Sequence, residues 1–391
     1  MELKLRDYQR EALEAILKNK KGIVVLPTGA GKTIIGVALI KCLQKRYDEV
    51  EYYILVPTRA LIDQWYAVLS KYKVPLTLGH VMTYASFISL AERSPTSIFG
   101  KITIEKSLLS ATKPVSRTTL IIVDEAHHSH LDTKLWSAVL LANPEYLVGF
   151  TATPNPYKQY AIPVIYRRSL LELSEYIAEL NIHKISVALE DKDRDQFLAY
   201  TQELAEIRRQ IGTALKRGDM EKVEQLRLAE DSLLSIIPFT IAMDNNILNT
   251  TVDLASALYN ETGERMLIRT MRIAAATVIS EMIKKKAGIP GDKILVYRGK
   301  EDIDKLFHQN WKILISVKAL SEGIDIPDLS LAILSSYEYG NLIGLIQTIG
   351  RTLRRTPTKE RADVYILVPN LHKYEVAYER LMRYIRTGEQ R

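Results

Sequence analysis

The sequence is poor in cysteine and contains no long apolar run. A single cysteine, Cys42, among 391 residues excludes an internal disulfide framework and a cysteine-based zinc site. The longest apolar runs, such as 23–26 and 121–123, have the length of a strand and are far too short to span a membrane. The N-terminal residues MELKLRDYQR lack the apolar core of a signal peptide. We therefore expect a protein of the cytoplasm or the nucleoid with no membrane partner.

Histidine is also scarce, and charge is distributed unevenly between the two signs. The seven histidines are scattered, and the adjacent pair His127 and His128 has no evident third metal ligand. The 53 basic residues exceed the 46 acidic ones, which gives a net charge of +7. A basic chain suits a polyanionic partner, because Lys and Arg release condensed counterions when they neutralise phosphates. An ordinary solvated surface would carry the same charge, so the charge indicates a nucleic acid only beside a motif.

The first part of the chain alternates between strand-like and helix-like segments. A length of 391 residues suits two domains of ordinary size. Continuous apolar strands that alternate with helices predict a parallel sheet covered on both faces, and ligands bind such sheets at the carboxyl ends of the strands. The expected strands are 22–26, 52–56, 120–123 and 147–150, and the clearest expected helices are 33–45 and 60–71.

A different pattern occupies residues 191–263. Apolar residues recur there at spacings of three, four and seven, which is typical of one face of a helix. Gly218 and Asp219 indicate the end of a first helix and the cap of a second, and we expect a third helix after Pro238. The exposed faces carry several arginines and lysines. Two interpretations remain open for this insertion, a solvated charged hairpin and an arm that contacts nucleic acid.

The α/β alternation resumes at Met266 and continues to a basic amphipathic segment at 374–386, which we expect to form a terminal helix. The strands expected in this part are MLIRT, KILVYRG, KILISV, LAILSS and VYILVP. The predicted fold class is therefore α/β, with two parallel-sheet domains in tandem. We expect the first domain at 1–162 and the second at 163–391, and the second contains the helical insertion at about 191–263.

The stretch LPTGAGKT, residues 26–33, resembles a phosphate-binding loop. Small residues let successive backbone N–H groups face the phosphates, a lysine supplies positive charge, and a hydroxyl binds Mg²⁺. The stretch lies between the expected strand GIVVL and a helix, as such a loop requires. Leu26 stands where the general pattern has its first glycine, so the loop alone could also be a glycine-rich turn. The candidate ATP-binding residues are Thr28, Gly29, Ala30, Gly31, Lys32 and Thr33.

The acidic pair in VDEAHH follows the expected strand LIIV. In a nucleotide site Asp124 would hold Mg²⁺ together with Thr33, and Glu125 would orient and deprotonate the attacking water. An Asp-Glu pair after a strand is also a common start of a helix. The pair follows Lys32 by about 90 residues on the same predicted sheet, and this spacing favours the catalytic interpretation.

Two motifs in the second half of the chain contain residues that could also act on a bound nucleotide. In QTIGRTLRR a glycine precedes Arg351 and Arg354, which can act as arginine fingers on a γ-phosphate held by the other domain. An alternative interpretation, the basic end of a helix, would explain the arginines but not the whole pattern of the motif. The loop ALSEGIDIP contains Gly323 and Asp325, which could face the nucleotide.

The ordered set of motifs resembles the superfamily 2 helicases and translocases. LRDYQ, LPTGAGKT, VPTRALIDQW, VMTYASF, DEAH, GFTATP, MLIRT, ALSEGIDIP and QTIGRTLRR occur in the order of that family and span nearly the whole chain. In this family the phosphate loop does not have a glycine at the position of Leu26. Gly29 replaces that glycine. The combination of TATP, EGIDIP and QTIGRTLRR is most similar to the XPB-like DNA repair helicases and their phage and prokaryotic relatives.

This resemblance implies two RecA-like domains with ATP and Mg²⁺ between them and a thumb-like helical insertion. Lys32, Asp124, Glu125, Arg351 and Arg354 would be the catalytic residues. The resemblance further implies adenine contacts from Arg6 and Gln9, coupling through His127, Thr151, Thr153 and Gln347, and nucleic-acid contacts from Thr58, Arg59, Thr83 and Thr348.

We therefore expect an ATP-dependent DNA helicase or translocase that moves along or remodels duplex, forked or single-stranded DNA, in repair, recombination or replication. One alternative is an RNA helicase, although DEAH and the wording of QTIGRTLRR argue against it. Others are a motor subunit of a larger nuclease or restriction complex with a nuclease partner, and an inactive scaffold. The intact set Lys32, Asp124, Glu125 and Arg351 argues against the scaffold.

Overall fold

The computed structural model divides the chain into two compact units, built mainly from residues 1–176 and 177–382, and each is described by itself. No helix in the described part of the chain is both long enough and apolar enough to cross a membrane. The structure describes residues 3–75, 79–93, 116–128, 134–152, 162–176, 178–298, 305–306, 309–317, 326, 329–337, 342–352 and 361–387.

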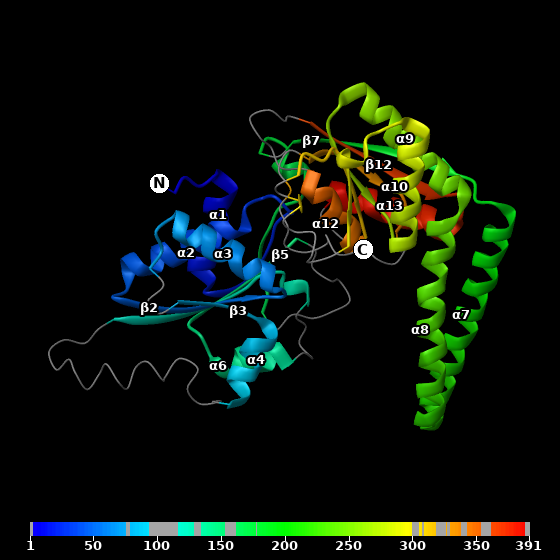
Figure 1. Ribbon diagram of the computed structural model, residues 1–391. Coiled ribbons are helices and arrows are strands. Elements are labelled where there is room, and N and C mark those ends of the chain that lie inside the picture. Colours follow the sequence, from blue (N-terminus) through cyan, green and yellow to red (C-terminus); the bar gives the residue numbers. More distant parts are fainter. Residues whose placement is uncertain are drawn as a thin grey trace. The chain divides into compact units, whose positions relative to one another are not determined.

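The first unit contains a six-stranded parallel sheet in the order β3-β2-β4-β5-β1-β6 (Figure 1). β1 lies between β5 and β6, and β4 lies between β2 and β5, so the strands that precede the phosphate loop and the acidic pair are both internal. The carboxyl ends of all six strands therefore meet at one edge. The strands are β1 (Lys21–Val25), β2 (Glu49–Val56), β3 (Gly79–Thr83), β4 (Arg117–Val123), β5 (Tyr146–Thr151) and β6 (Val164–Arg167).

Helices cover both faces of this sheet, as the continuous apolar strands predict. Alternate residues of one strand belong to different cores: Tyr52 and Ile54 pack with one cluster of buried side chains, whereas Tyr53 and Leu55 pack with the other. The first cluster includes α1 (Asp7–Asn19), α2 (Lys32–Arg46) and α3 (Arg59–Lys71), and the second includes α4 (Tyr84–Arg93) and α6 (Lys134–Ala142).

The second unit contains another six-stranded parallel sheet, in the order β7-β12-β11-β8-β10-β9. β7 pairs along its full length with β12 and is an edge strand of the sheet. The strands are β7 (Glu179–Val187), β8 (Arg265–Arg269), β9 (Ile294–Tyr297), β10 (Ile313–Ser316), β11 (Leu329–Leu334) and β12 (Arg361–Pro369), and helices α10 (Ile273–Ala287), α12 (Leu342–Thr352) and α13 (His372–Thr387) belong to this α/β part.

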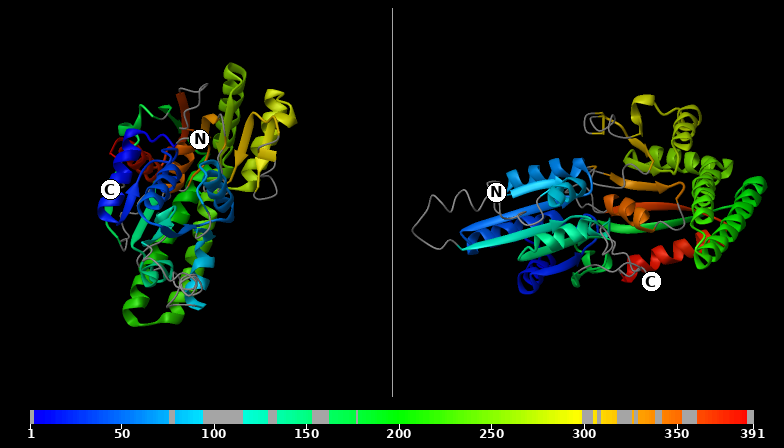
Figure 2. Two further views of the ribbon diagram at one scale, coloured as in Figure 1. Left: turned by 90° about the vertical axis from the view of Figure 1, so that its left-hand side faces the viewer. Right: turned by 90° about the horizontal axis from the view of Figure 1, so that it is seen from below.

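Two long helices of the insertion, α7 (Asp191–Arg217) and α8 (Met220–Met243), form an antiparallel pair that extends well beyond the second sheet (Figures 1 and 2). Gly218 ends α7 with a φ of 73°, and the Asp219 carboxylate accepts a hydrogen bond from the backbone N–H of Lys222 at the start of α8. The helix end and cap expected at these two residues are present.

The third helix of the insertion begins later than the sequence analysis expects. Pro238 lies inside α8, and α9 (Asn245–Thr262) starts after Asp244, whose carboxylate accepts a hydrogen bond from the N–H of Ile247. A proline interrupts one backbone hydrogen bond but does not end a helix whose apolar face is held by packing. Pro238 and its neighbour Ile237 are both buried.

The boundary expected at residue 162 also differs from the structure. β6, which that boundary assigns to the second domain, pairs with β1 of the first sheet. The first unit accordingly continues to Tyr176. β6 is a short edge strand with an exposed or half-buried pattern, so it lacks the continuous apolar run by which the internal strands are recognised.

Candidate nucleotide site

The candidate phosphate loop connects β1 to α2 at the carboxyl edge of the first sheet. Gly29 and Gly31 have φ values of 84° and 75°, which residues with a Cβ rarely adopt. A Cβ on Gly31 would also lie 2.6 Å from Nε2 of Gln9. The φ values therefore favour glycine at both positions, and a Cβ at Gly31 would also displace the side-chain amide of Gln9.

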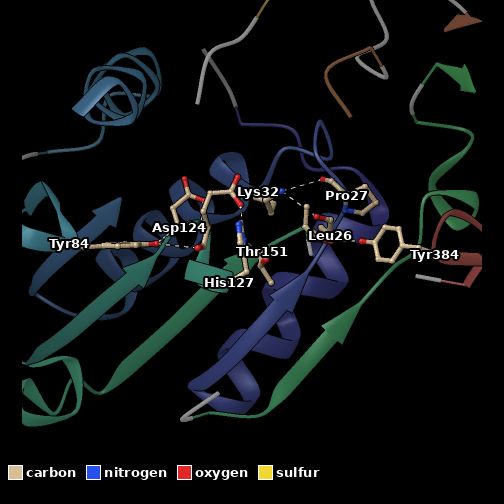
Figure 3. Close-up of polar contacts among 10 residues, drawn as sticks. Leu26, Pro27, Lys32, Tyr84, Asp124, His127, Thr151 and Tyr384 are labelled. Carbon is tan, nitrogen blue, oxygen red and sulfur yellow. Dashed lines mark hydrogen bonds and ion pairs between the residues drawn. The ribbon is translucent and has the colours of Figure 1, made fainter. Parts of the chain in front are cut away.

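Lys32, the first residue of α2, lies across this loop. Its ammonium group donates hydrogen bonds to the carbonyl oxygens of Leu26 at 3.2 Å and Pro27 at 3.4 Å, and the residue is buried (Figure 3). The hydroxyl of Thr28 is buried without a hydrogen-bond partner among the described residues. A buried positive charge and a buried unpaired hydroxyl at a helix N-terminus form a site that suits a phosphate chain.

Helix α1 supports the loop from one side. The side chain of Gln9 donates to the carbonyl of Ala30 at 2.9 Å and accepts from the backbone N–H of Arg6 at 3.0 Å. The hydroxyl of Tyr8 donates to the same Ala30 carbonyl at 2.8 Å, and Arg6 donates to the carbonyl of Tyr176. Arg6 and Gln9 thus lie beside the phosphate loop, and their contact with adenine stays a prediction.

Asp124 follows β4 and is held by two donors. Its Oδ2 accepts a hydrogen bond from the indole Nε1 of Trp65 at 2.9 Å, and its Oδ1 accepts from the backbone N–H of Glu125 at 3.0 Å. Burial, and next the charge of Glu125, raise the pKa of Asp124 to about 6, while the Trp65 hydrogen bond and Lys32 act in the opposite direction. The carboxylate is therefore oriented before any ligand arrives, and a nearby cation would favour its ionised form.

Glu125 has a strained backbone and a carboxylate oxygen with unused acceptor capacity. Its φ is 51°, in the left-handed region. Its Oε2 is buried without a hydrogen-bond partner among the described residues and lies 3.4 Å from Nδ1 of His127. A buried acceptor of this kind costs free energy unless it serves another partner, and a water molecule to be deprotonated is such a partner.

His127 connects the acidic motif to the end of β5. Its Nδ1 lies 3.1 Å from the hydroxyl of Thr151, and both residues are buried (Figure 3). The structure thus brings together two of the residues that the sequence analysis assigns to coupling. Another of them, Thr153, lies outside the described residues.

These side chains fit ATP with Mg²⁺. Hard oxygen ligands at the carboxyl edge are what Mg²⁺ prefers, and Asp124 and Thr33 could supply them. Among the described residues, the hydroxyl of Thr28 and Oε2 of Glu125 have no hydrogen-bond partner, so the site has polar atoms with unused bonding capacity. Lys32 adds the positive charge that a triphosphate needs.

The predicted nucleic-acid contacts of the first unit follow strands of the same sheet. Thr58 precedes α3 with its hydroxyl buried and unpaired among the described residues, and Arg59 is exposed as the first residue of that helix. Thr83 ends β3, and its hydroxyl lies 2.9 Å from that of Ser86. Their contact with nucleic acid stays a prediction.

In the second unit the predicted contact residue Thr348 points into the domain. It is buried on α12, where its hydroxyl accepts a hydrogen bond from Arg269 at 2.6 Å and donates to the carbonyl of Gly344 at 2.8 Å. This arrangement argues against a direct contact between the Thr348 side chain and nucleic acid. Gln347 and Arg351 belong to α12 by their backbone, whereas Gly323, Asp325 and Arg354 lie outside the described residues.

Sequence reasoning assigns no role to two residues that touch the acidic pair. One is Trp65, the partner of Asp124. The other is Tyr84, whose hydroxyl donates to the backbone carbonyls of Asp124 and Glu125. Both lie in stretches recognised as motifs, VPTRALIDQW and VMTYASF, so their positions were visible but their partners were not.

A glycine loop that ends in lysine and lies on the same sheet edge as an Asp-Glu pair defines a P-loop nucleotide hydrolase with two parallel α/β units. Comparison with known proteins identifies the family, within this class, to which the chain belongs. The family model described as "Type III restriction enzyme, res subunit" matches residues 2–156, and that described as "Helicase conserved C-terminal domain" matches residues 249–356. The chain belongs to the superfamily 2 helicases and translocases, whose members are nucleic-acid-dependent ATPases.

Among curated proteins the chain is 29% identical to the DNA 3'-5' translocase XPB2 of Sulfurisphaera tokodaii, over 97% of this chain and 84% of the relative. It is 26% identical to a putative ATP-dependent RNA helicase of Methanocaldococcus jannaschii, over 64% of this chain and 30% of the relative. The crystal structure of the Pyrococcus furiosus Hef helicase domain has the same fold, with a TM-score of 0.57 and 16% identity over 96% of this chain and 97% of that one.

Proposed function

We propose that this protein is an ATP-dependent DNA helicase or translocase that hydrolyses ATP with the residues at the carboxyl edge of its first sheet. The observation that carries this proposal is the buried Oε2 of Glu125, which has no hydrogen-bond partner among the described residues and follows an oriented Asp124 in the chain. A carboxylate in this state can take the proton of a water molecule that attacks a γ-phosphate.

Each residue of the first unit has a distinct part in this reaction. The N–H groups of the glycine loop and the ammonium of Lys32 bind the β- and γ-phosphates, and Asp124 and Thr33 hold the ion. When bound, Mg²⁺ neutralises charge that develops on the phosphate oxygens. Glu125 orients the water and accepts its proton. We further propose that Arg351 and Arg354 stabilise the same charge from the second unit.

The comparison with relatives favours DNA as the nucleic acid. The DNA translocase relative aligns with nearly the whole chain, whereas the RNA helicase relative aligns with 64% of it and at lower identity. A net charge of +7 agrees with either polyanion and does not distinguish them.

The decisive experiment measures ATP turnover with no nucleic acid and with duplex DNA, single-stranded DNA, forked DNA and RNA. We expect DNA to raise turnover and RNA to have little effect. The same rate under all of these conditions would refute the proposal, and stimulation by RNA alone would support the RNA helicase instead. Strand separation and translocation are then distinguished with a labelled fork and a triplex-displacement assay.

Replacing Lys32 by Ala should reduce ATP turnover by about 10²–10³-fold, since it removes the positive charge beside the developing phosphate charge. The matched control is Lys41→Ala, which changes a lysine on the same helix that is not part of the loop. Turnover that survives in Lys32→Ala would show that the loop does not bind the phosphates.

A second candidate is a motor subunit of a nuclease or restriction complex, favoured by the description of the family model that matches residues 2–156. A nuclease that co-purifies with the tagged chain from its native cells in fixed stoichiometry would support it. Isolation of the chain alone, with full DNA-stimulated activity, would favour an independent motor.

A further inference from the structure

The hydroxyl of Tyr84 bridges the two backbone carbonyls that flank the catalytic Glu125. It shares its single proton between the carbonyl of Asp124 and, at 3.2 Å, the carbonyl of Glu125. Figure 3 shows the ring of Tyr84 directed at Asp124, at the opposite end of the site from Leu26 and Pro27. The contact comes from α4 and joins residues that lie 40 and 41 positions apart in the sequence.

The Tyr84 hydroxyl contacts the backbone at Glu125, which is a strained residue. The φ of 51° at Glu125 is unfavourable for a residue with a Cβ, and such a conformation persists only where its surroundings hold it. The N–H of Glu125 is held by the carboxylate of Asp124, and the two carbonyls around Glu125 are held by Tyr84. These contacts fix the peptide planes on both sides of Glu125 and therefore the direction in which its side chain leaves the backbone.

Tyr84 is also joined to the strand that carries a predicted nucleic-acid contact. It follows Thr83 directly, and the Thr83 hydroxyl accepts a hydrogen bond from the N–H of Ser86 at 3.2 Å, which caps α4. Among the described strands, β3 pairs with β2 alone and lies at the edge of the sheet. A shift of Thr83 can therefore move Tyr84 without breaking the internal strand pairs of the sheet.

We propose that Tyr84 is a positioning residue that sets the orientation of Glu125 and makes it respond to nucleic acid bound near Thr83. Without nucleic acid the Tyr84 hydroxyl holds Glu125 in the strained conformation seen here. When a phosphate backbone engages the end of β3, the shift of Tyr84 re-aims the peptide and the carboxylate toward the attacking water. This inference rests on the proposed function, because it explains how DNA would raise ATP turnover.

The test is Tyr84→Phe, which removes only the hydroxyl. The matched control is Tyr66→Phe, because the Tyr66 hydroxyl contacts the same strand, at the N–H of Val81 (3.4 Å), without touching the acidic pair. Four quantities are measured for each variant: basal turnover, turnover at saturating duplex or single-stranded DNA, DNA affinity by fluorescence anisotropy, and melting temperature.

We expect Tyr84→Phe to lower the ratio of DNA-stimulated to basal turnover by about tenfold or more, within the range that a positioned general base contributes. Its DNA affinity should stay within about twofold of the wild type, which separates a positioning role from a binding role. Tyr66→Phe should keep the wild-type ratio.

Several results would overturn the inference. They are an unchanged ratio in Tyr84→Phe, an equal loss of basal and stimulated turnover, which indicates a purely structural role, and a loss that is confined to DNA affinity. If Tyr84→Phe unfolds, replacement of Tyr84 by 4-aminophenylalanine keeps a donor at the para position of the ring and should retain part of the stimulation; no stimulation in this folded variant would equally refute the proposal. A wild-type enzyme that DNA does not stimulate would reject the proposed function itself, and this inference with it.

Discussion

At the scale of single residues, the hydrogen bond from Trp65 orients Asp124, the carboxylate proposed to hold Mg²⁺. The indole is almost fully buried and lies so close to α2 that a Cβ on Gly36 would be 2.7 Å from its Cη2. The glycine therefore makes room for the ring that orients the carboxylate. Residues that orient a metal ligand without touching the metal change affinity for the ion by about 10–100-fold when removed.

Replacing Trp65 by Phe should raise the Mg²⁺ concentration needed for half-maximal ATP turnover by about tenfold. The ring packing is largely kept, while Asp124 loses the donor that orients it, so turnover at saturating Mg²⁺ should change much less. The measurement is ATP turnover as a function of Mg²⁺ concentration.

The control for this variant is Trp136→Phe. Trp136 is a buried ring of α6 whose indole nitrogen has no hydrogen-bond partner among the described residues. Equal Mg²⁺ requirements in the two variants would show that the Trp65 hydrogen bond has no part in holding the ion.

A second prediction concerns Glu51, a buried carboxyl group on β2. Burial raises its pKa to about 7, helped by the charge of Glu49 and opposed by that of Arg117. Because the folded state binds this proton more tightly than the unfolded state, the stabilising contribution is complete below about pH 4.5 and is lost as the pH rises through about 7. Glutamine does not ionise, so the Glu51→Gln variant does not lose stability in this pH range. We expect it to raise the free energy of unfolding by ~1–3 kcal/mol at pH 8 and to change little at pH 4.5.

The measurement is thermal or urea unfolding of wild type and Glu51→Gln at both pH values. Glu49→Gln serves as the control, because Glu49 is part-exposed and forms an ion pair with Arg117 at 2.7 Å. It should give no gain at pH 8. A gain of the same size at both pH values in Glu51→Gln would show that proton binding by Glu51 is not the cause.

The residues of the candidate site were predictable where a motif places them at a strand end. Lys32, Asp124, His127 and Thr151 follow strands of one parallel sheet, so their convergence follows from the fold. The contacts of Trp65 and Tyr84 were not predictable, because they join residues 40 to 59 positions apart through side-chain directions that no sequence pattern encodes. The backbone conformation of Glu125 likewise leaves no mark on the sequence.

At the scale of elements, predictability depends on whether a strand is buried enough to form a continuous apolar run. β1, β4 and β5 are covered on both faces, read as continuous apolar runs and were expected from the sequence. β6 and β7 lie at sheet edges and expose much of their surface, so the same criterion misses them. The helices of the insertion were recognised by their apolar period, and the turn between α7 and α8 by Gly218 and Asp219.

The tip of the α7–α8 pair gives a test of the two interpretations of the insertion. Lys216, Arg217 and Lys222 are exposed around the turn. If they bind phosphates, replacing all three by Glu should weaken DNA binding and reduce the slope of log affinity against log salt by about one for each phosphate that is no longer neutralised. The measurement is fluorescence anisotropy with duplex DNA over a range of salt concentrations.

The matched control replaces Lys284, Lys285 and Lys286 at the end of α10 by Glu, which makes the same change of charge elsewhere in the second unit. Similar weakening by both triple variants would mean that net charge alone matters, and the hairpin would then be a solvated surface rather than an arm that binds DNA.

At the scale of the whole molecule, the proposed activity needs residues from both units. The first unit contains the phosphate loop and the acidic pair, and the motif with the arginines begins on α12 of the second. We expect Arg354→Ala to keep ATP binding within about a few-fold and to lower hydrolysis by about 10³-fold or more, as expected for an arginine finger. Nucleotide binding is measured with a fluorescent ATP analogue and hydrolysis by phosphate release.

Arg361→Ala is the control, because Arg361 is an exposed arginine of β12 that pairs with Asp363 at 2.9 Å. Loss of ATP binding in Arg354→Ala would instead indicate a structural role for this arginine. Equal effects of Arg354→Ala and Arg361→Ala would show that the arginine motif has no part in the proposed reaction.

The topology of the first sheet also constrains how the protein is made. β1 ends at Val25, but its two neighbours are β5, which starts at Tyr146, and β6, which ends at Arg167. A ribosome that builds the chain from its N-terminus therefore releases the strand before the phosphate loop long before either partner exists. The nucleotide site uses residues at the ends of β1, β4 and β5, so it cannot assemble until β5 has left the exit tunnel. During that interval the apolar β1 has no pairing partner of its own, and a nascent-chain chaperone would find its target there.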